Sequence, residues 1–154
     1  MNQRGLSLIE VLLITVLIAL VVGSLIQLGI RSLHTADEGR TEGVAMELTK
    51  EAIEIARSKR DEDSTDFFAQ IEEDGNGYYR LLGGNVFEFV GAVEPLPPNL
   101  SLYEVTGYSG YYRVISFTLD GTGTNLKMWV RTYWRTSTGR YDSIVLETIF
   151  TKWR

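Results

Sequence analysis

The chain has 154 residues, of which 44% are hydrophobic and 23% are charged, so its composition is that of a folded domain and not of a disordered chain. It contains no cysteine, which excludes a disulfide framework, a thiolate metal site and a cysteine nucleophile, and its one histidine, His34, is a poor basis for a catalytic triad or a zinc site. The net charge of −5 argues against a surface that binds nucleic acid throughout.

The 25 residues from Leu6 to Ile30 carry a single charged side chain, Glu10. As an α-helix this segment would be roughly 37 Å long, which is enough to cross a hydrocarbon core of about 30 Å. It is too long and too apolar on all sides for the core helix of a soluble protein, and too long for the apolar part of a secretory signal. Residues 6–30 are therefore predicted to be a transmembrane helix. Arg4 weakly favours a cytoplasmic N-terminus, although Arg31 nearly balances the count.

Glu10 lies inside this apolar segment. A carboxylate costs about 2.5–3.5 kcal/mol at the centre of a membrane helix, and less near its end. Such groups usually have a positive partner, but the next basic residue is Arg31, about 30 Å further along a helix. We therefore expect the partner of Glu10 to be a backbone amine or a group on another subunit.

The sequence RGLSLIEVLL at residues 4–13 resembles the cleavage junction of type IV prepilins and of the pseudopilins of type II secretion. The resemblance implies that residues 1–5 are a leader whose charge is Arg4, that a prepilin peptidase cleaves between Gly5 and Leu6, and that Leu6 is then N-methylated. It also implies that Glu10 pairs with the N-terminal amine of a neighbouring subunit during filament assembly. Ser7 stands where the family commonly has Thr.

One position departs from the family pattern. The first mature residue is usually Phe in this family, and here it is Leu6. Together with the absence of a cysteine pair, this difference favours a minor subunit. Cleavage after Gly5 would also create a new amine on Leu6, with Glu10 as the fifth residue of the mature chain, which would supply the cation that a buried carboxylate needs.

The helix is predicted to continue from residue 31 to residue 60, because this stretch lacks proline and its apolar residues recur at helical spacing. The expected buried stripe consists of Ala45, Leu48, Ala52, Ile55 and Ala56. The region also resembles the one that follows the membrane helix in minor pilins and the smaller pseudopilins; the matching residues are Leu48, Ile53, Glu54 and Arg57, with Thr49 in place of a common Ala. Residues 61–77 are predicted to be an acidic connecting loop.

Beyond Asp74, glycine-rich turns separate short runs of β-branched and aromatic residues. Strands are predicted at 78–82, 86–90, 102–106, 112–120, 126–135 and 143–152, and the last three are joined by sequences that suit hairpin turns. Residues 78–154 are therefore expected to form an antiparallel sheet of about four strands, packed on the amphipathic helix. The predicted fold is α+β and pilin-like, with a long N-terminal helix that has a membrane half and an amphipathic half.

Other candidate sites in the sequence have simpler explanations. Basic and aromatic residues that could hold single-stranded nucleic acid are Arg131, Tyr133, Trp134, Arg135, Arg140 and Tyr141, but ordinary sheet packing accounts for the same pattern. Asp61, Asp63 and Asp66 lack the glycine and the closing Glu of a calcium loop. Residues 120–125 lack a P-loop lysine and are predicted to be a turn. The sequence therefore predicts no catalytic residue, no metal and no cofactor.

The expected function is that of a structural subunit, a minor pilin or a pseudopilin, and not that of an enzyme. Its expected partners are other pilin subunits, the prepilin peptidase, an inner-membrane assembly platform and, before extraction, membrane lipid. Its expected location is the bacterial inner membrane, as a single-pass protein with a cytoplasmic N-terminus, and then a pilus or a periplasmic pseudopilus.

Two alternatives remain open. One is an adhesin or DNA-binding minor pilin that uses the sheet surface, and the other is a plain single-pass anchored domain. The junction motif is common to type IV pili, type II secretion and competence filaments.

Overall fold

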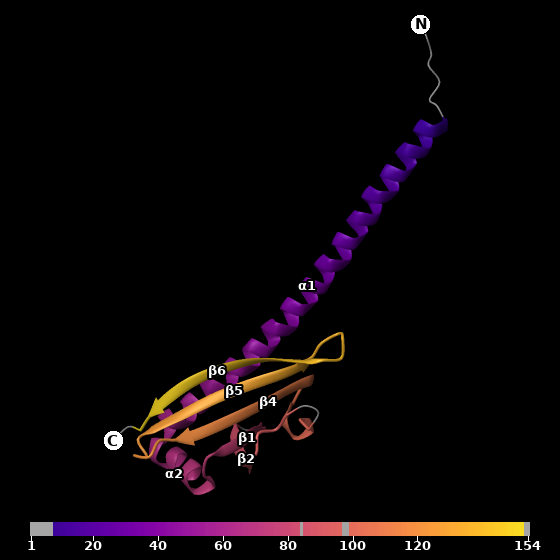
Figure 1. The fold of residues 1–154 in the computed structure, drawn as a ribbon. Coiled ribbons are helices and arrows are strands. Elements are labelled where there is room, and N and C mark those ends of the chain that lie inside the picture. Colours follow the sequence, from indigo (N-terminus) through magenta and orange to yellow (C-terminus); the bar gives the residue numbers. More distant parts are fainter. Residues whose placement is uncertain (1–7, 84, 97–98, 153–154) are drawn as a thin grey trace. The chain divides into compact units, whose positions relative to one another are not determined.

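The structure is a computed structural model that describes residues 8–83, 85–96 and 99–152 (Figure 1). The elements in chain order are α1 (Leu8–Glu62), α2 (Ser64–Asp74), β1 (Gly77–Leu82), β2 (Val86–Gly91), the short 3-10 helix η1 (Ser101–Tyr103), β3 (Glu104–Val105), β4 (Tyr108–Leu119), β5 (Asn125–Arg135) and β6 (Tyr141–Thr151). The chain divides into two compact units, of which the first is described from Leu8 to Arg40 and the second begins at Thr41.

The predicted α+β organisation is confirmed, with a long N-terminal helix of 55 residues and a C-terminal antiparallel sheet. The sheet has six strands instead of about four. Its order is β2-β1-β4-β5-β6, with β3 paired to β4, and Figure 1 shows the three long strands β4, β5 and β6 side by side. The short strands join the same sheet because β1 continues it beyond β4, through the pairing of Tyr79 with Ile115. The segment predicted as a strand at 102–106 is divided between η1 and β3.

Within the second unit, α1 buries a stripe of small and aliphatic side chains. The buried residues are Ala45, Leu48, Thr49, Ala52, Ile53 and Ala56. The prediction therefore holds for four positions, but Ile55 is only half-buried and Thr49 and Ile53 are additional. Three of the six are alanines with no exposed surface, which allows the helix backbone to approach its neighbours closely.

Polar contacts of Thr49 and of Arg113 join the buried part of α1 to the sheet. The hydroxyl of Thr49 lies 2.7 Å from the hydroxyl of Thr132 on β5 and donates to the carbonyl of Ala45. The guanidinium of Arg113 on β4, which is buried, donates to the carbonyl of Leu48 at 2.8 Å and to the carboxylate of Glu51 at 2.7 Å. These hydrogen bonds are directional, so they specify which residues of α1 lie against β4 and β5. Apolar packing alone would specify that position less tightly.

The predicted acidic loop at residues 61–77 is wrong over most of its length, because Ser64–Asp74 form the helix α2. Asp63 caps this helix, since its side chain accepts hydrogen bonds from the backbone amides of Thr65 and Asp66, both at 3.0 Å. The helix buries Phe67, Phe68 and Ile71. It ends at Asp74 and is capped by Gly75, whose φ of +81° favours glycine. In this stretch, Asp63 therefore caps the start of a helix, and the buried residues of that helix are apolar.

The main core lies between the helices and one face of the sheet. On β5, Met128, Val130 and Thr132 have no exposed surface and Trp134 is 7% exposed, so these alternating residues form the inward face of the strand. At the centre, the Phe117 ring contacts the rings of Phe67, Tyr79 and Phe87 at centroid distances of 5.8, 5.0 and 5.3 Å. This aromatic cluster joins α2, β1, β2 and β4.

The opposite face of the sheet carries a second, smaller core. Leu100 and Tyr103, which follow the proline-containing loop after β2, pack on Val114 and Tyr133 and are buried with them. Val114 and Tyr133 alternate along their strands with the residues of the main core, so they point to the other face. The sheet is therefore covered by side chains on both faces in this region.

Candidate functional site

The first unit exposes an apolar helix surface. Every residue from Leu8 to Arg40 is exposed in the isolated chain, although the large side chains from Leu8 to Ile30 are almost all aliphatic. By length and composition this helix can cross a membrane. Soluble proteins rarely expose an apolar surface of this extent, so the first unit is compatible with a single-pass membrane anchor.

The hydroxyl groups in this apolar stretch are bonded within the helix. Thr15 donates to the carbonyl of Val11 and Ser24 to the carbonyl of Val21, each at 2.8 Å. Neither hydroxyl therefore needs water or another chain when lipid surrounds the helix. Glu10 differs from them, since no hydrogen bond or ion pair to it exists within the described part of the chain. Glu10 is the one ionisable residue of the apolar stretch from Leu8 to Ile30, and a carboxylate in such surroundings requires a partner.

Glu10 lies in the first turn of α1, where a carboxylate is favoured by the helix dipole. The other residues that the sequence assigns to processing and assembly are Arg4, Gly5, Leu6 and Ser7. They lie outside the described residues, and the expectations for them stand on the sequence alone.

The basic and aromatic residues of the sheet do not form one continuous group. Trp134 faces the main core, and Tyr133 belongs to the second core. Arg131 donates to the carboxylate of Glu94 at 2.6 Å, and its guanidinium lies over the Trp129 ring at 5.2 Å. Sequence reasoning missed this contact, because 37 residues separate Glu94 from Arg131 and no spacing pattern links them.

The remaining three members of that set, Arg135, Arg140 and Tyr141, lie at the turn between β5 and β6. Arg135 is paired in register with Tyr141, and both arginines are exposed. Arg131 lies four residues before Arg135 on β5, and its guanidinium is already bonded to Glu94 and Tyr133.

The predicted turn at residues 120–125 is organised by Asp120. Its carboxylate accepts hydrogen bonds from the backbone amides of Thr122 and Thr124, from the Thr122 hydroxyl and from the Asn125 amide, at 2.8–3.2 Å. Desolvation alone would raise the pKa of Asp120, but the hydrogen bonds from Asn125, Thr122 and Thr124 outweigh it and hold the pKa below its usual range. All these bonds lie within the loop, which supports the prediction of a structural turn.

Metal ligation finds no support in the part of the chain that the structure describes, where no group of three or more His, Asp or Glu residues lies close enough to hold an ion. Asp61 pairs with Arg60 at 2.6 Å, and Asp63 caps α2. His34 is exposed on α1.

Comparison of the chain with protein-family models, with curated proteins and with solved structures finds no match.

Proposed function

We propose that this chain is a structural subunit, a minor pilin or a pseudopilin, of a filament related to type IV pili. The junction RGLSLIEVLL and the apolar run that follows it are the basis in sequence. The structural observation that carries the proposal is the exposed apolar half of α1, with Glu10 unpaired in its first turn among the described residues. Such a surface is suited to lipid at one stage and to the same segment of other subunits at the next.

Processing prepares the segment for assembly in this proposal. Hydrolysis of the Gly5–Leu6 peptide bond by the prepilin peptidase leaves a carboxylate on Gly5 and a free amine on Leu6. Methylation of that amine retains its positive charge. The mature chain then has a cation at its first residue and the carboxylate of Glu10 at its fifth, and both lie at the same end of an apolar helix.

Pairing between subunits follows from these two charges. In axially staggered helices, the carboxylate of Glu10 in one subunit meets the N-terminal amine of its neighbour. A charge pair in an apolar environment is costly to break and tolerates little displacement, so it sets the register of packing. The second unit plays no part in this pairing and is carried on the filament surface.

The membrane stage precedes assembly. The segment 6–30 holds the subunit in the cytoplasmic membrane, with the N-terminus in the cytoplasm, until the assembly platform extracts it. The chain itself performs no catalysis in this account, because the peptidase and the platform do the chemical and mechanical work.

Substitution of Glu10→Gln tests the proposal, because it removes the charge and keeps the size. In the cell that makes the protein, we expect the variant to remain in the membrane fraction and to be lost from the sheared filament fraction. The matched control is Glu47→Gln, which removes an exposed carboxylate from the part of α1 in the second unit. Normal incorporation of the Glu10→Gln variant would overturn the proposed pairing.

A further inference from the structure

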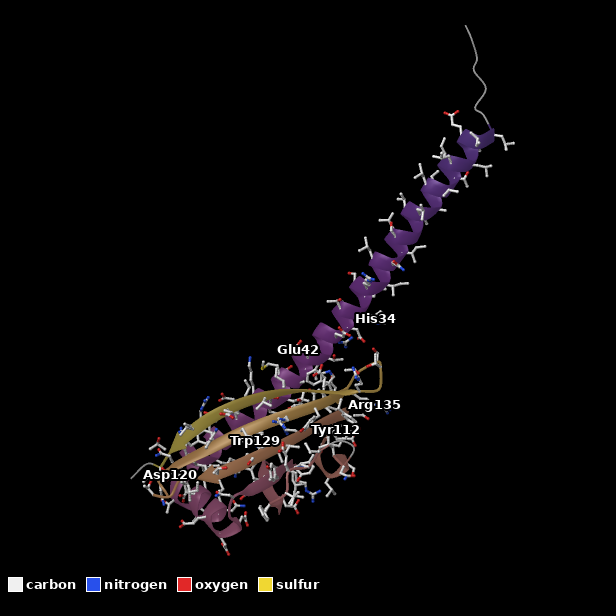
Figure 2. All side chains as sticks on the ribbon, viewed as in Figure 1. His34, Glu42, Tyr112, Asp120, Trp129 and Arg135 are labelled. Atoms are coloured by element: carbon white, nitrogen blue, oxygen red, sulfur yellow. The ribbon has the colours of Figure 1, made fainter. Side chains whose placement is uncertain are left out.

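The two ends of the sheet in the second unit differ in chemistry. Figure 2 shows Asp120 at one end of the long strands, and Tyr112 and Arg135 at the other. The Asp120 end lies near α2, because the amide of Leu119 donates to the side chain of Asn76, two residues beyond that helix. Residues 61–74, which include α2, contain seven acidic residues and no basic one. The opposite end has the turn between β5 and β6, whose residues 135–140 contain two arginines and no acidic residue.

The chain enters the second unit at this basic end. The hydroxyl of Tyr111 donates to the carbonyl of Thr41, the first residue of the second unit, at 3.4 Å. Tyr111 is paired in register with Trp134, directly before Arg135. Only residues 31–40 separate Thr41 from the apolar segment, and as part of α1 they span about 15 Å. If the apolar segment crosses a bilayer, this short connection tethers Thr41 near the headgroups.

The side chains at the turn suit phosphate headgroups. Arg135 and Arg140 are exposed, and within the described residues neither forms an ion pair. A guanidinium binds phosphate oxygens in bidentate fashion. Ser137 and Thr138 lie between the two arginines in sequence, and both have exposed side chains that carry a hydroxyl group.

Tyrosine side chains accompany the arginines at this end. Tyr108 is 46% exposed, and the rings of Tyr112 and Tyr141 contact each other with their centroids 6.0 Å apart. Tyrosine is enriched at the boundary between membrane and water. Two nearby carboxylates are engaged with backbone amides, that of Glu104 with Gly110 and that of Asp142 with Ser143. Neither carboxylate forms an ion pair with Arg135 or Arg140 in the described part of the chain.

We infer that the β5–β6 turn, Arg135–Arg140, docks on the phosphate headgroups of the membrane that anchors α1, and so orients the second unit before assembly. An anionic bilayer attracts the arginine end and repels the acidic end around α2. It therefore favours the orientation in which the β5–β6 turn faces the membrane and α2 points away from it. The inference rests on the membrane-anchoring part of the proposed function and is independent of filament formation.

Site-directed fluorescence on the full chain tests this inference, and the absence of natural cysteine makes each introduced one unique. The full-length protein is reconstituted in vesicles of phosphatidylcholine and phosphatidylglycerol that contain a lipid with a nitroxide on its headgroup. A fluorophore is attached at Ser137→Cys in the turn, or at Gly121→Cys at the opposite end. Gly121 is a suitable control because a Cβ there meets no atom within 4 Å.

We expect strong quenching of the label at position 137 and little at position 121. The double variant Arg135→Gln, Arg140→Gln should lose the quenching at 137, and about 1 M salt should weaken it, since the Debye length falls to about 3 Å. The matched control variant, Arg57→Gln, Lys127→Gln, also removes two exposed positive charges and should retain it. Equal quenching at the two sites, or quenching that persists in the Arg135/Arg140 double variant, would overturn the inference.

A third label separates this inference from the anchor on which it rests. A fluorophore at Val16→Cys, within the apolar segment, should be quenched by nitroxides on the acyl chains. Quenching at 16 without quenching at 137 would refute headgroup docking and leave the anchor intact. No quenching at 16 would refute the anchor and the docking with it. Binding of single-stranded DNA through Arg135 and Arg140, with no quenching at 137, would assign the turn to nucleic acid and overturn the inference.

Discussion

The two parts of α1 have the same backbone conformation and opposite surfaces. From Leu8 to Arg40 every side chain is exposed, whereas from Ala45 to Ala56 the helix buries six side chains. The first part is apolar around its whole circumference as far as Ile30, with Glu10 as its one charged residue, and the second is apolar along a single stripe. The comparison teaches that the second part finds its packing partners within its own chain, while the first has no buried side chain from Leu8 to Arg40.

The largest difference between the two parts should appear in truncations of apolar side chains. Phe117→Ala removes a ring without exposed surface that contacts three other rings, and should lower the free energy of unfolding by about 3–5 kcal/mol. Leu17→Ala removes a side chain that is 53% exposed and belongs to neither core, and should leave the free energy of unfolding almost unchanged. Denaturant unfolding of the full chain in detergent micelles, followed by tryptophan fluorescence, measures both. Equal effects would contradict the contrast.

The hydroxyl pair between α1 and β5 should show a strong non-additive effect. Thr49→Val leaves the buried Thr132 hydroxyl without its partner, and should destabilise the second unit by about 1–3 kcal/mol. Replacing both threonines by valine removes both polar groups, and should recover most of that loss. A double-mutant cycle in the same unfolding assay measures the coupling, and purely additive effects would show that the pair is unimportant.

Alkaline pH should weaken the second unit through Tyr79. Burial, with a smaller contribution from Asp74, raises the pKa of Tyr79 to about 12 from its ordinary value of 10.0. The folded state thus holds this proton more tightly, so the associated stability is present below pH 10 and is lost as the pH rises towards 12. Tyr79→Phe removes the hydrogen bond to the Gly75 carbonyl, should cost about 1 kcal/mol at neutral pH, and should flatten the alkaline decline. Unfolding curves of both proteins across this pH range measure the difference.

The smallest effect is expected on the solvated side of α1 in the second unit. Glu54 and Arg57 form an ion pair at 2.5 Å with both side chains largely exposed. Glu54→Gln should change the free energy of unfolding by less than about 0.5 kcal/mol, because solvent and salt screen such pairs. A loss comparable to that of Phe117→Ala, in the same assay, would mean that this side of the helix is packed in a way that the structure does not show.

Local patterns in the sequence predicted the elements well. Helical spacing and the absence of proline located α1, and glycine-rich turns between runs of β-branched and aromatic residues located the three long strands β4, β5 and β6. The acidic stretch was misread as a loop because its composition obscured a helix start. The start is visible in the capping side chain of Asp63 and in the spacing of Phe67, Phe68 and Ile71.

Contacts between distant residues could not be predicted in the same way. The pairs Arg113–Glu51, Thr49–Thr132 and Glu94–Arg131 join residues that lie far apart in the chain, and no period links them. The addition of β1 and β2 to the sheet also depends on such distant pairing, which is why the strand number was underestimated. For the candidate site, the position of Glu10 in the apolar helix was readable from sequence alone, and its exposure is what the structure adds.

The most direct test of the proposed function is the mass of the N-terminal peptide of the protein recovered from its native membrane. The account predicts a peptide that begins at Leu6 and carries one methyl group on its amine. Such a peptide would establish prepilin processing and supply the cation for Glu10. An intact peptide that begins at Met1 would contradict the account, because the chain would then be an uncleaved membrane-anchored sheet domain in which Glu10 has some other partner.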